Sequence, residues 1–155
     1  MPRMDTSGLD YLIRDMQRMG QASGEVAKAM VNAAVIEIRD AWKESAEKHG
    51  LVDTGDMIGS IGFPAPVASI GEALYRDVYP IGKDRKGTRN AEKAFVLNYG
   101  TSRIRPTYWV DEADQAAEPR VQERLEGIWD EFLETGKVPS IVDGGSAGGV
   151  NTIIK

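Results

Sequence analysis

Apolar residues recur at helical spacing in three parts of the chain. Over 8–20 and again over 23–48 they return every three or four residues, which predicts a short helix followed by a long one. Ser23 is suited to cap the long helix, and His49-Gly50 to end it. The same spacing over 108–134 predicts a last helix, and Pro119 inside it predicts a kink or a restart.

The segment that follows the long helix has a different pattern. Apolar residues alternate over 60–81 between proline and glycine, which predicts two short strands joined by a hairpin. Just before them, Asp53-Thr54-Gly55 reads as a turn or a helix cap, and Met57-Ile58 with Ile61 can form one further helical turn. Helices followed by strands and a helix indicate an α+β domain, with the helices packed on one face of a small, mostly antiparallel sheet.

Three more segments complete the plan of the chain. Residues 82–93 hold no large apolar side chain, so we expect a mobile loop there. A short apolar segment over 94–99 ends at Gly100-Thr101, and Arg103 to Pro106 should be extended. The segment from Gly136 onward contains five glycines with Pro139 and Ser140. We therefore predict one domain over 1–135 and a flexible tail over 136–155, with Ile153-Ile154 suited to dock on a neighbour.

Composition narrows the chemistry open to the 155 residues. The absence of cysteine excludes disulfides, thiolate catalysis and cysteine-bound metal. The single histidine, His49, excludes a histidine-paired metal site within one subunit. We expect no cofactor and no metal. No apolar run approaches the ~18 residues of a membrane span, and the first residues carry no secretory signal, so we expect a cytoplasmic protein in the cell that makes it.

Charge is spread unevenly. The net charge is −5, but residues 51–107 carry eight basic and six acidic groups, whereas 108–155 carry four and ten. A net acidic chain is a poor general nucleic-acid binder. A basic middle beside an acidic end would instead suit contacts between copies of the chain.

Leu51-Val52-Asp53-Thr54-Gly55 matches the active-site signature of retroviral-type aspartic peptidases, which are homodimers whose two aspartates share a proton. Those enzymes are almost entirely β-structure, whereas here a long helix leads into the triplet. Their second landmark, an apolar pair followed by glycine and then by arginine or asparagine, is also missing. We therefore favour a structural turn, and keep a peptidase that uses Asp53 as an alternative.

Three clusters could serve in binding. The basic loop can contact protein or nucleic-acid backbone, or simply be solvated, and Tyr108-Trp109 with the two preceding arginines can anchor an interface or seal the core. Acidic residues of the last helix can form a solvated face or an intersubunit patch. The basic loop contributes Lys83, Arg85, Lys86, Arg89 and Lys93, and the interface candidates are Arg103, Arg105, Tyr108, Trp109, Glu123, Glu126 and Asp130.

Together, three segments resemble the minor tail-component, or tail-completion, family of long-tailed double-stranded DNA phages. A long helix leads into Val52-Asp53-Thr54-Gly55-Asp56-Met57-Ile58-Gly59-Ser60-Ile61. Next comes Phe95-Val96-Leu97-Asn98-Tyr99-Gly100-Thr101-Ser102, and then Arg105-Pro106-Thr107-Tyr108-Trp109 opens the final helix. The resemblance covers about residues 8–134. Leu51 stands where the family usually has proline, and Asn98 where glutamate is common.

The resemblance implies a virion protein without enzymatic activity at the head–tail junction. It would form a ring, of six copies in the expected case, around the DNA channel, between head-connector proteins and tail-terminator or tail-tube proteins. The chain would pass through the host cytoplasm during assembly. A heterologous ring requires each copy to present two unlike, complementary faces. A DNA-binding accessory protein that uses the 82–93 basic residues is a further alternative.

Overall fold

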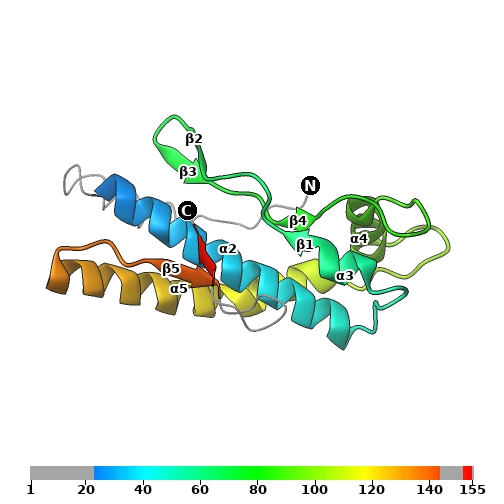
Figure 1. Cartoon of the computed structure of the whole chain (residues 1–155). Coiled ribbons are helices and arrows are strands. Elements are labelled where there is room, and N and C mark those ends of the chain that lie inside the picture. The colour runs from blue at the N-terminus through cyan, green and yellow to red at the C-terminus, as the bar shows by residue number, and fades with distance from the viewer. Residues whose placement is uncertain (1–22, 144–151, 155) are drawn as a thin grey trace. The chain divides into compact units, whose positions relative to one another are not determined.

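Two long helices, α2 (Ser23–Lys48) and α5 (Trp109–Thr135), pack together in the computed structural model (Figure 1). The structure describes residues 23–143 and 152–154, so the helix predicted over 8–20 lies outside the described residues. Three small antiparallel two-stranded sheets accompany the helices. The α+β class is confirmed, with three separate two-stranded sheets in place of the single sheet that we predicted. Within the described ranges, no helix is long and apolar enough to cross a membrane.

The predicted long helices have the bounds that their apolar periodicity indicated. The predicted inward positions of α2, among them Val31, Ile38 and Trp42, are all buried. Burial extends around the helix to three polar residues, Asn32, Arg39 and Ser45. Helix α5 continues through Pro119, and the division of the chain into two compact units falls between Glu118 and Pro119.

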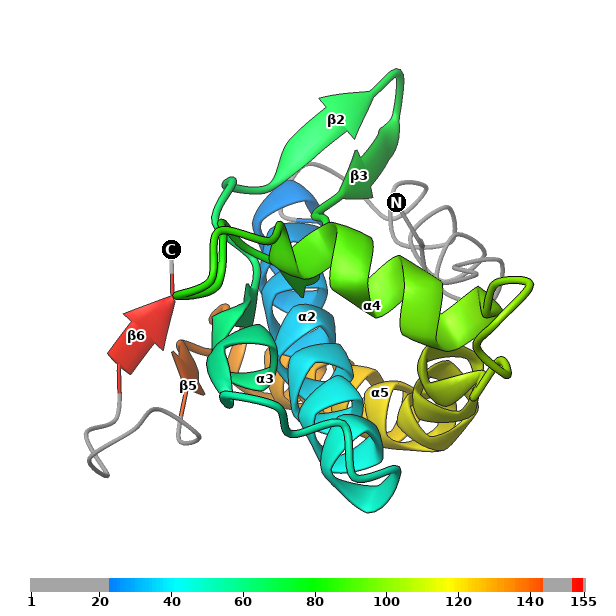
Figure 2. The ribbon, with the colours of Figure 1, turned by 90° about the vertical axis from the view of Figure 1, so that its right-hand side faces the viewer.

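The first unit comprises, among described residues, Ile38–Pro64 and Asp77–Glu118. The predicted helical turn after Gly55 is confirmed as α3, and the first and last strands of the central segment pair in the register Ile61↔Pro80 and Gly62↔Tyr79. Helices α3 and α4 and strand β4 contact one another (Figure 2). Beyond the parts of α2 and α5, the elements of this unit are α3 (Asp56–Ser60), β1 (Ile61–Gly62), β4 (Tyr79–Pro80) and α4 (Asn90–Tyr99).

Helix α4 begins inside the segment that we predicted to be a loop. Its buried positions are Asn90, Ala94 and Asn98, at intervals of four residues. Two of these three inward side chains are asparagines, and the large apolar Phe95 is exposed. Because apolar residues do not mark the buried face of α4, their periodicity could not predict this helix.

The second unit comprises 23–37, Ala65–Arg76 and 119–143 with 152–154 of the described residues. It contains the predicted hairpin, which turns at Gly71, where φ is +61°. Arg76 fixes the hairpin's end, because its Nη1 donates to Asn32 Oδ1 at 2.8 Å and its Nε to the Ala65 carbonyl at 2.7 Å. The strands of this hairpin are β2 (Ala68–Ile70) and β3 (Ala73–Tyr75).

Two strands lie in the segment that we predicted to be a flexible tail. Strand β5 (Ile141–Asp143) pairs antiparallel with β6 (Thr152–Ile154). Val142 lies opposite Ile153, so the backbone of the Ile153-Ile154 pair bonds to its own chain.

Candidate functional site

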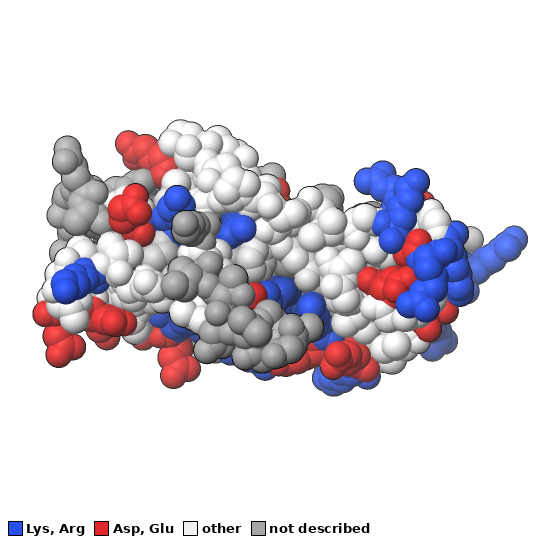
Figure 3. All heavy atoms as spheres, in the orientation of Figure 1, with Lys and Arg blue, Asp and Glu red and all other residues white. Residues whose placement is uncertain are grey.

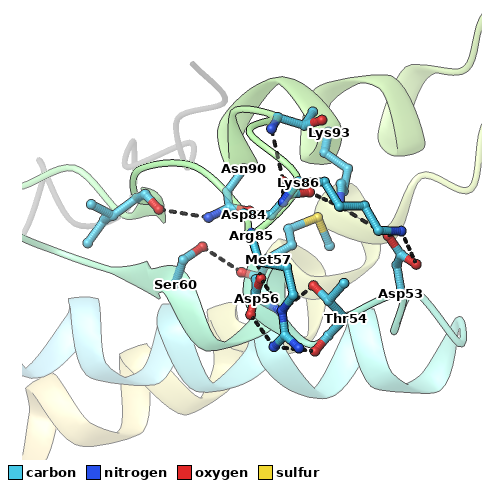
Figure 4. A network of polar contacts seen from close by, with 12 residues as sticks. Asp53, Thr54, Asp56, Met57, Ser60, Asp84, Arg85, Lys86, Asn90 and Lys93 are labelled. Carbon is cyan, nitrogen blue, oxygen red and sulfur yellow. Dashed lines mark hydrogen bonds and ion pairs between the residues drawn. The ribbon is translucent and has the colours of Figure 1, made fainter.

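The 82–93 loop is organised around one buried carboxylate, that of Asp84. Its side chain is 1% exposed. It accepts hydrogen bonds from the backbone N–H groups of Lys86 and Thr88, both at 2.9 Å, and from Lys93 Nζ at 2.6 Å (Figure 4). The Lys93 ammonium, followed by the Thr88 amide, holds the pKa of Asp84 below its usual value. These contacts restrain the loop from within.

Three ion pairs join this loop to the Asp-Thr-Gly turn and to Asp56, which follows it (Figure 4). Arg85 donates from Nε and Nη2 to the two carboxylate oxygens of Asp56, at 3.0 and 2.9 Å, and its backbone N–H adds a third bond at 2.9 Å. Lys86 Nζ lies 3.1 Å from Asp53 Oδ2, and Lys93 Nζ lies 3.5 Å from the same atom. Arg85 lowers the pKa of Asp56 strongly, and Lys86 lowers that of Asp53.

The Asp-Thr-Gly triplet forms a turn that leads into α3. Gly55 has a φ of +84°, a conformation that glycine adopts without steric cost. Thr54 Oγ1 accepts the Asp56 N–H at 3.2 Å. A carboxyl that shares a proton with a partner must resist ionisation, whereas two ammonium groups favour the ionised form of Asp53. The local electrostatics therefore favour Asp53 as an ion-pair partner that holds the 82–93 loop over Asp53 as an acid–base catalyst.

Two cations of the loop have no such partner. Lys83 and Arg89 lie opposite each other in an isolated antiparallel bridge. In the described part of the chain, neither side chain forms an ion pair or a side-chain hydrogen bond. Basic and acidic side chains lie intermixed around this loop in Figure 3, which reflects the pairing of Arg85, Lys86 and Lys93 with aspartates.

The segment after α4 folds back on the helix end and starts α5. Gly100 has φ +73° and ψ 179°, a region open essentially to glycine alone. Thr101 N–H donates to the Ile104 carbonyl at 2.9 Å, and the Thr107 hydroxyl donates to the Leu97 carbonyl at 2.7 Å. A tight corner therefore joins the two helices.

Asn98 fixes the first turn of α5 from the end of α4. It is fully buried, and its Oδ1 accepts the Val110 N–H at 2.9 Å. Its Nδ2 donates to Asp111 Oδ2 at 3.2 Å. Because the first N–H groups of a helix have no partner within the helix, Asn98 does the work of a capping residue from a distant position. Our sequence analysis did not assign it this role.

The candidate interface residues at the start of α5 differ in exposure. Trp109 is 0% exposed, and its Nε1 donates to the Ala94 carbonyl at 3.2 Å. Its ring meets Trp42 edge to face, with centroids 5.7 Å apart. In this structure it seals the core of its own unit. Tyr108, in contrast, is 53% exposed, and Arg103 and Arg105 are exposed.

The C-terminal end of α2 is tied to the first turn of α5. His49 Nε2 lies 2.5 Å from Glu112 Oε2, and Lys48 Nζ bonds to the other carboxylate oxygen. Lys48 and then His49 lower the pKa of Glu112. The contact with Glu112 gives His49 a structural function, so its presence does not require a catalytic one.

The remaining candidates lie on α5 in the second unit. Glu123, Glu126 and Asp130 are all exposed. Across the described residues, no group of three or more histidine, aspartate or glutamate side chains is arranged to hold a metal ion.

Sequence reasoning missed two organising residues of this region, Asp84 and Asn98. Asp84 forms an Asx turn, in which the aspartate side chain accepts a hydrogen bond from the backbone N–H two residues later, here that of Lys86. An aspartate in a loop that also contains Gly87-Thr88 could have indicated this turn from the sequence. Comparison with known proteins adds no relative: no family model, curated protein or solved structure matches the chain.

Proposed function

We propose that this chain is a structural virion protein at the head–tail junction of a long-tailed double-stranded DNA phage, where copies of it form a ring around the DNA channel. It acts without a cofactor and joins head-connector proteins to tail-terminator or tail-tube proteins. It passes through the host cytoplasm during assembly and ends in the virion.

One observation carries the proposal. The three segments on which the family resemblance rests, 52–61, 95–102 and 105–109, lie in the same unit. Within it, Asn98 and Ala94 of α4 bond to the start of α5. Residues of the last two segments hold the corner between α4 and α5 together, and this structural use of the motif residues supports a scaffold function.

The peptidase alternative uses Asp53. Its carboxylate is paired with Lys86 and Lys93, which keep it ionised and oppose proton sharing. Asp53→Asn separates the two functions, since it should abolish peptidase activity and leave the structural function unchanged. The exposed Lys86–Asp53 pair contributes little to stability, so loss of folding should not obscure the result.

The DNA-binding alternative uses the basic loop. Alanine at Lys83 and Arg89, the two loop cations without a partner, should lower salt-sensitive DNA affinity if this alternative holds. Equal binding by the wild-type chain and this variant would remove the alternative.

Particle assembly tests the proposal directly. An amber mutation in the gene should yield filled heads and tails that do not join, and the wild-type and D53N chains should both restore joined particles. Antibody labelling of intact particles should mark the neck. The proposal fails if purified particles lack the chain, if the label marks the distal tail tip, or if D53N does not complement.

A further inference from the structure

The first unit exposes aromatic and basic side chains together at the end of α4. Phe95 and Tyr99 are 52% and 48% exposed, and their rings contact each other with centroids 4.8 Å apart. Ile104 and Tyr108 are also exposed, and both lie close to the helix end. Thr101 N–H bonds the Ile104 carbonyl, and Tyr108 N–H bonds the Asn98 carbonyl at 3.0 Å.

Two arginines flank these apolar groups. Arg103 and Arg105 lie in the same folded-back segment, and in the described ranges neither side chain has an acidic partner. Exposed aromatic groups near arginine are typical of protein–protein interfaces. We call this surface the basic face; it consists of Phe95, Tyr99, Arg103, Ile104, Arg105 and Tyr108.

The second unit exposes a surface of the opposite charge on α5. Leu133 is 59% exposed and lies three and seven residues after Asp130 and Glu126, so the three share one side of the helix. Trp129, half-buried, borders that side. Within the described chain, Glu123, Glu126 and Asp130 form no ion pair. This acidic face consists of Glu123, Glu126, Trp129, Asp130 and Leu133.

We infer that the basic face of one copy binds the acidic face of a second copy, in a head-to-tail contact. Each face joins exposed apolar groups to uncompensated charge, and the two charges are opposite. Apolar contact supplies affinity, and the charges select the partner and its register. The faces are unlike, so the contact is heterologous and can close into a ring.

A second copy fits the basic face better than a nucleic acid. Contacts to the phosphates of a duplex draw on cations and hydrogen-bond donors and do not use apolar rings, so the loop pair Lys83 and Arg89 suits them better than the basic face does. Phe95 and Tyr99 would remain exposed to water in a phosphate contact. The inference rests on the proposed function only for the closure of the ring; the contact itself is a property of the purified chain.

Charge reversal on each face tests the contact, with the full-length chain examined by sedimentation and native mass spectrometry. R103E/R105E and E126K/D130K should each weaken self-association about tenfold or more. K83E/R89E is the matched control, because it reverses two exposed, unpaired cations outside the face, and it should associate like the wild type. The chain that carries both pairs of reversals should regain association.

A mixture of the two single-face variants tests the pairing of unlike faces. Each variant alone carries two faces of the same charge, whereas in the mixture the intact faces are complementary and so are the reversed ones, so the mixture should associate like the wild type. A monomeric wild type at micromolar concentration, unchanged association of R103E/R105E, or failure of the combined reversal to restore association would overturn the inference.

Circular dichroism checks folding, and R103Q/R105Q repeats the test if a reversal unfolds the chain. Failure of the contact leaves the neck labelling described above unaffected, so the two proposals can fail separately.

Discussion

The indole Nε1 of Trp42 donates a hydrogen bond to Oδ1 of Asp114 at 2.8 Å, and this bond links α2 to α5 in the first unit. Trp42 is 1% exposed, so the indole needs this acceptor. Burial, with a smaller contribution from Asp111, raises the pKa of Asp114 in spite of the bond. The carboxyl therefore serves as a structural acceptor that ionises less readily than it would in water.

The raised pKa of Asp114 predicts a specific pH dependence. A carboxyl whose pKa is higher in the folded state favours folding most at low pH, and loses that contribution as pH rises from the unfolded value of 3.8 through the folded one. Asp114→Asn keeps an acceptor oxygen and cannot ionise. Its melting temperature should match the wild type near pH 3 and equal or exceed it at pH 7.

Asp114→Ala is the matched comparison, because it removes the acceptor itself. The unpaired indole N–H should cost about 1–3 kcal/mol at every pH, or about 2–4 °C in melting temperature for each kcal/mol. A D114N chain that melts well below the wild type at pH 7 would contradict this explanation.

The turn at Gly100 should be far less tolerant than the turn at Gly55. A Cβ at Gly100 would lie 2.6 Å from the Ile104 carbonyl oxygen and 2.7 Å from Pro106 N, whereas one at Gly55 meets nothing within 4 Å. Gly55→Ala should cost about 1 kcal/mol for its left-handed backbone. Gly100→Ala should cost about 3 kcal/mol or more, since backbone must also move. Denaturant unfolding of both variants measures the difference, and equal losses would refute it.

Local periodicity was sufficient for the long helices. In α2 and α5 the apolar residues mark the buried side over many turns, so their bounds could be predicted. Helix α4 could not, because Asn90 and Asn98 occupy its buried side and Phe95 its exposed one. Strands β5 and β6 are three residues each, too short to yield a pattern of their own.

The candidate site could be predicted only as a set of residue types. Sequence marks the 82–93 loop as basic but cannot tell which cations are neutralised. The partners of Arg85 and Lys86 lie 29 and 33 positions away, at Asp56 and Asp53. Similarly, nothing local separates Tyr108 from Trp109, which the fold places at the surface and in the core.

Asp84 should control the order of the basic loop. Asp84→Asn removes the charge that attracts Lys93 and replaces one carboxylate oxygen by an NH2 group, so the remaining oxygen cannot serve both Lys93 and the Lys86 and Thr88 amides as the carboxylate does. Hydrogen exchange over 82–93 should therefore become several-fold faster while exchange in α2 stays unchanged. The lowered pKa makes this tether complete above about pH 4 and weaker as pH falls through the folded value. The protection factors of the wild-type loop, which correct for the slower intrinsic exchange at low pH, should therefore fall on acidification. A D84N loop with the wild-type rate would refute the role.

Asn98 should be essential to the start of α5, because it supplies the acceptor for the buried Val110 N–H at 2.9 Å. Asn98→Leu keeps the branched shape of the side chain but leaves that N–H unpaired, which should cost about 1–3 kcal/mol in unfolding free energy. Tyr99→Ser, at the exposed neighbouring position, should change stability by no more than about 0.5 kcal/mol. Urea unfolding followed by tryptophan fluorescence measures the stability of both variants, because Trp109 lies at the start of α5 beside Val110. Equal stability of N98L and the wild type would mean that α5 starts without help from α4, and that the corner is held by Thr107 and Gly100 alone.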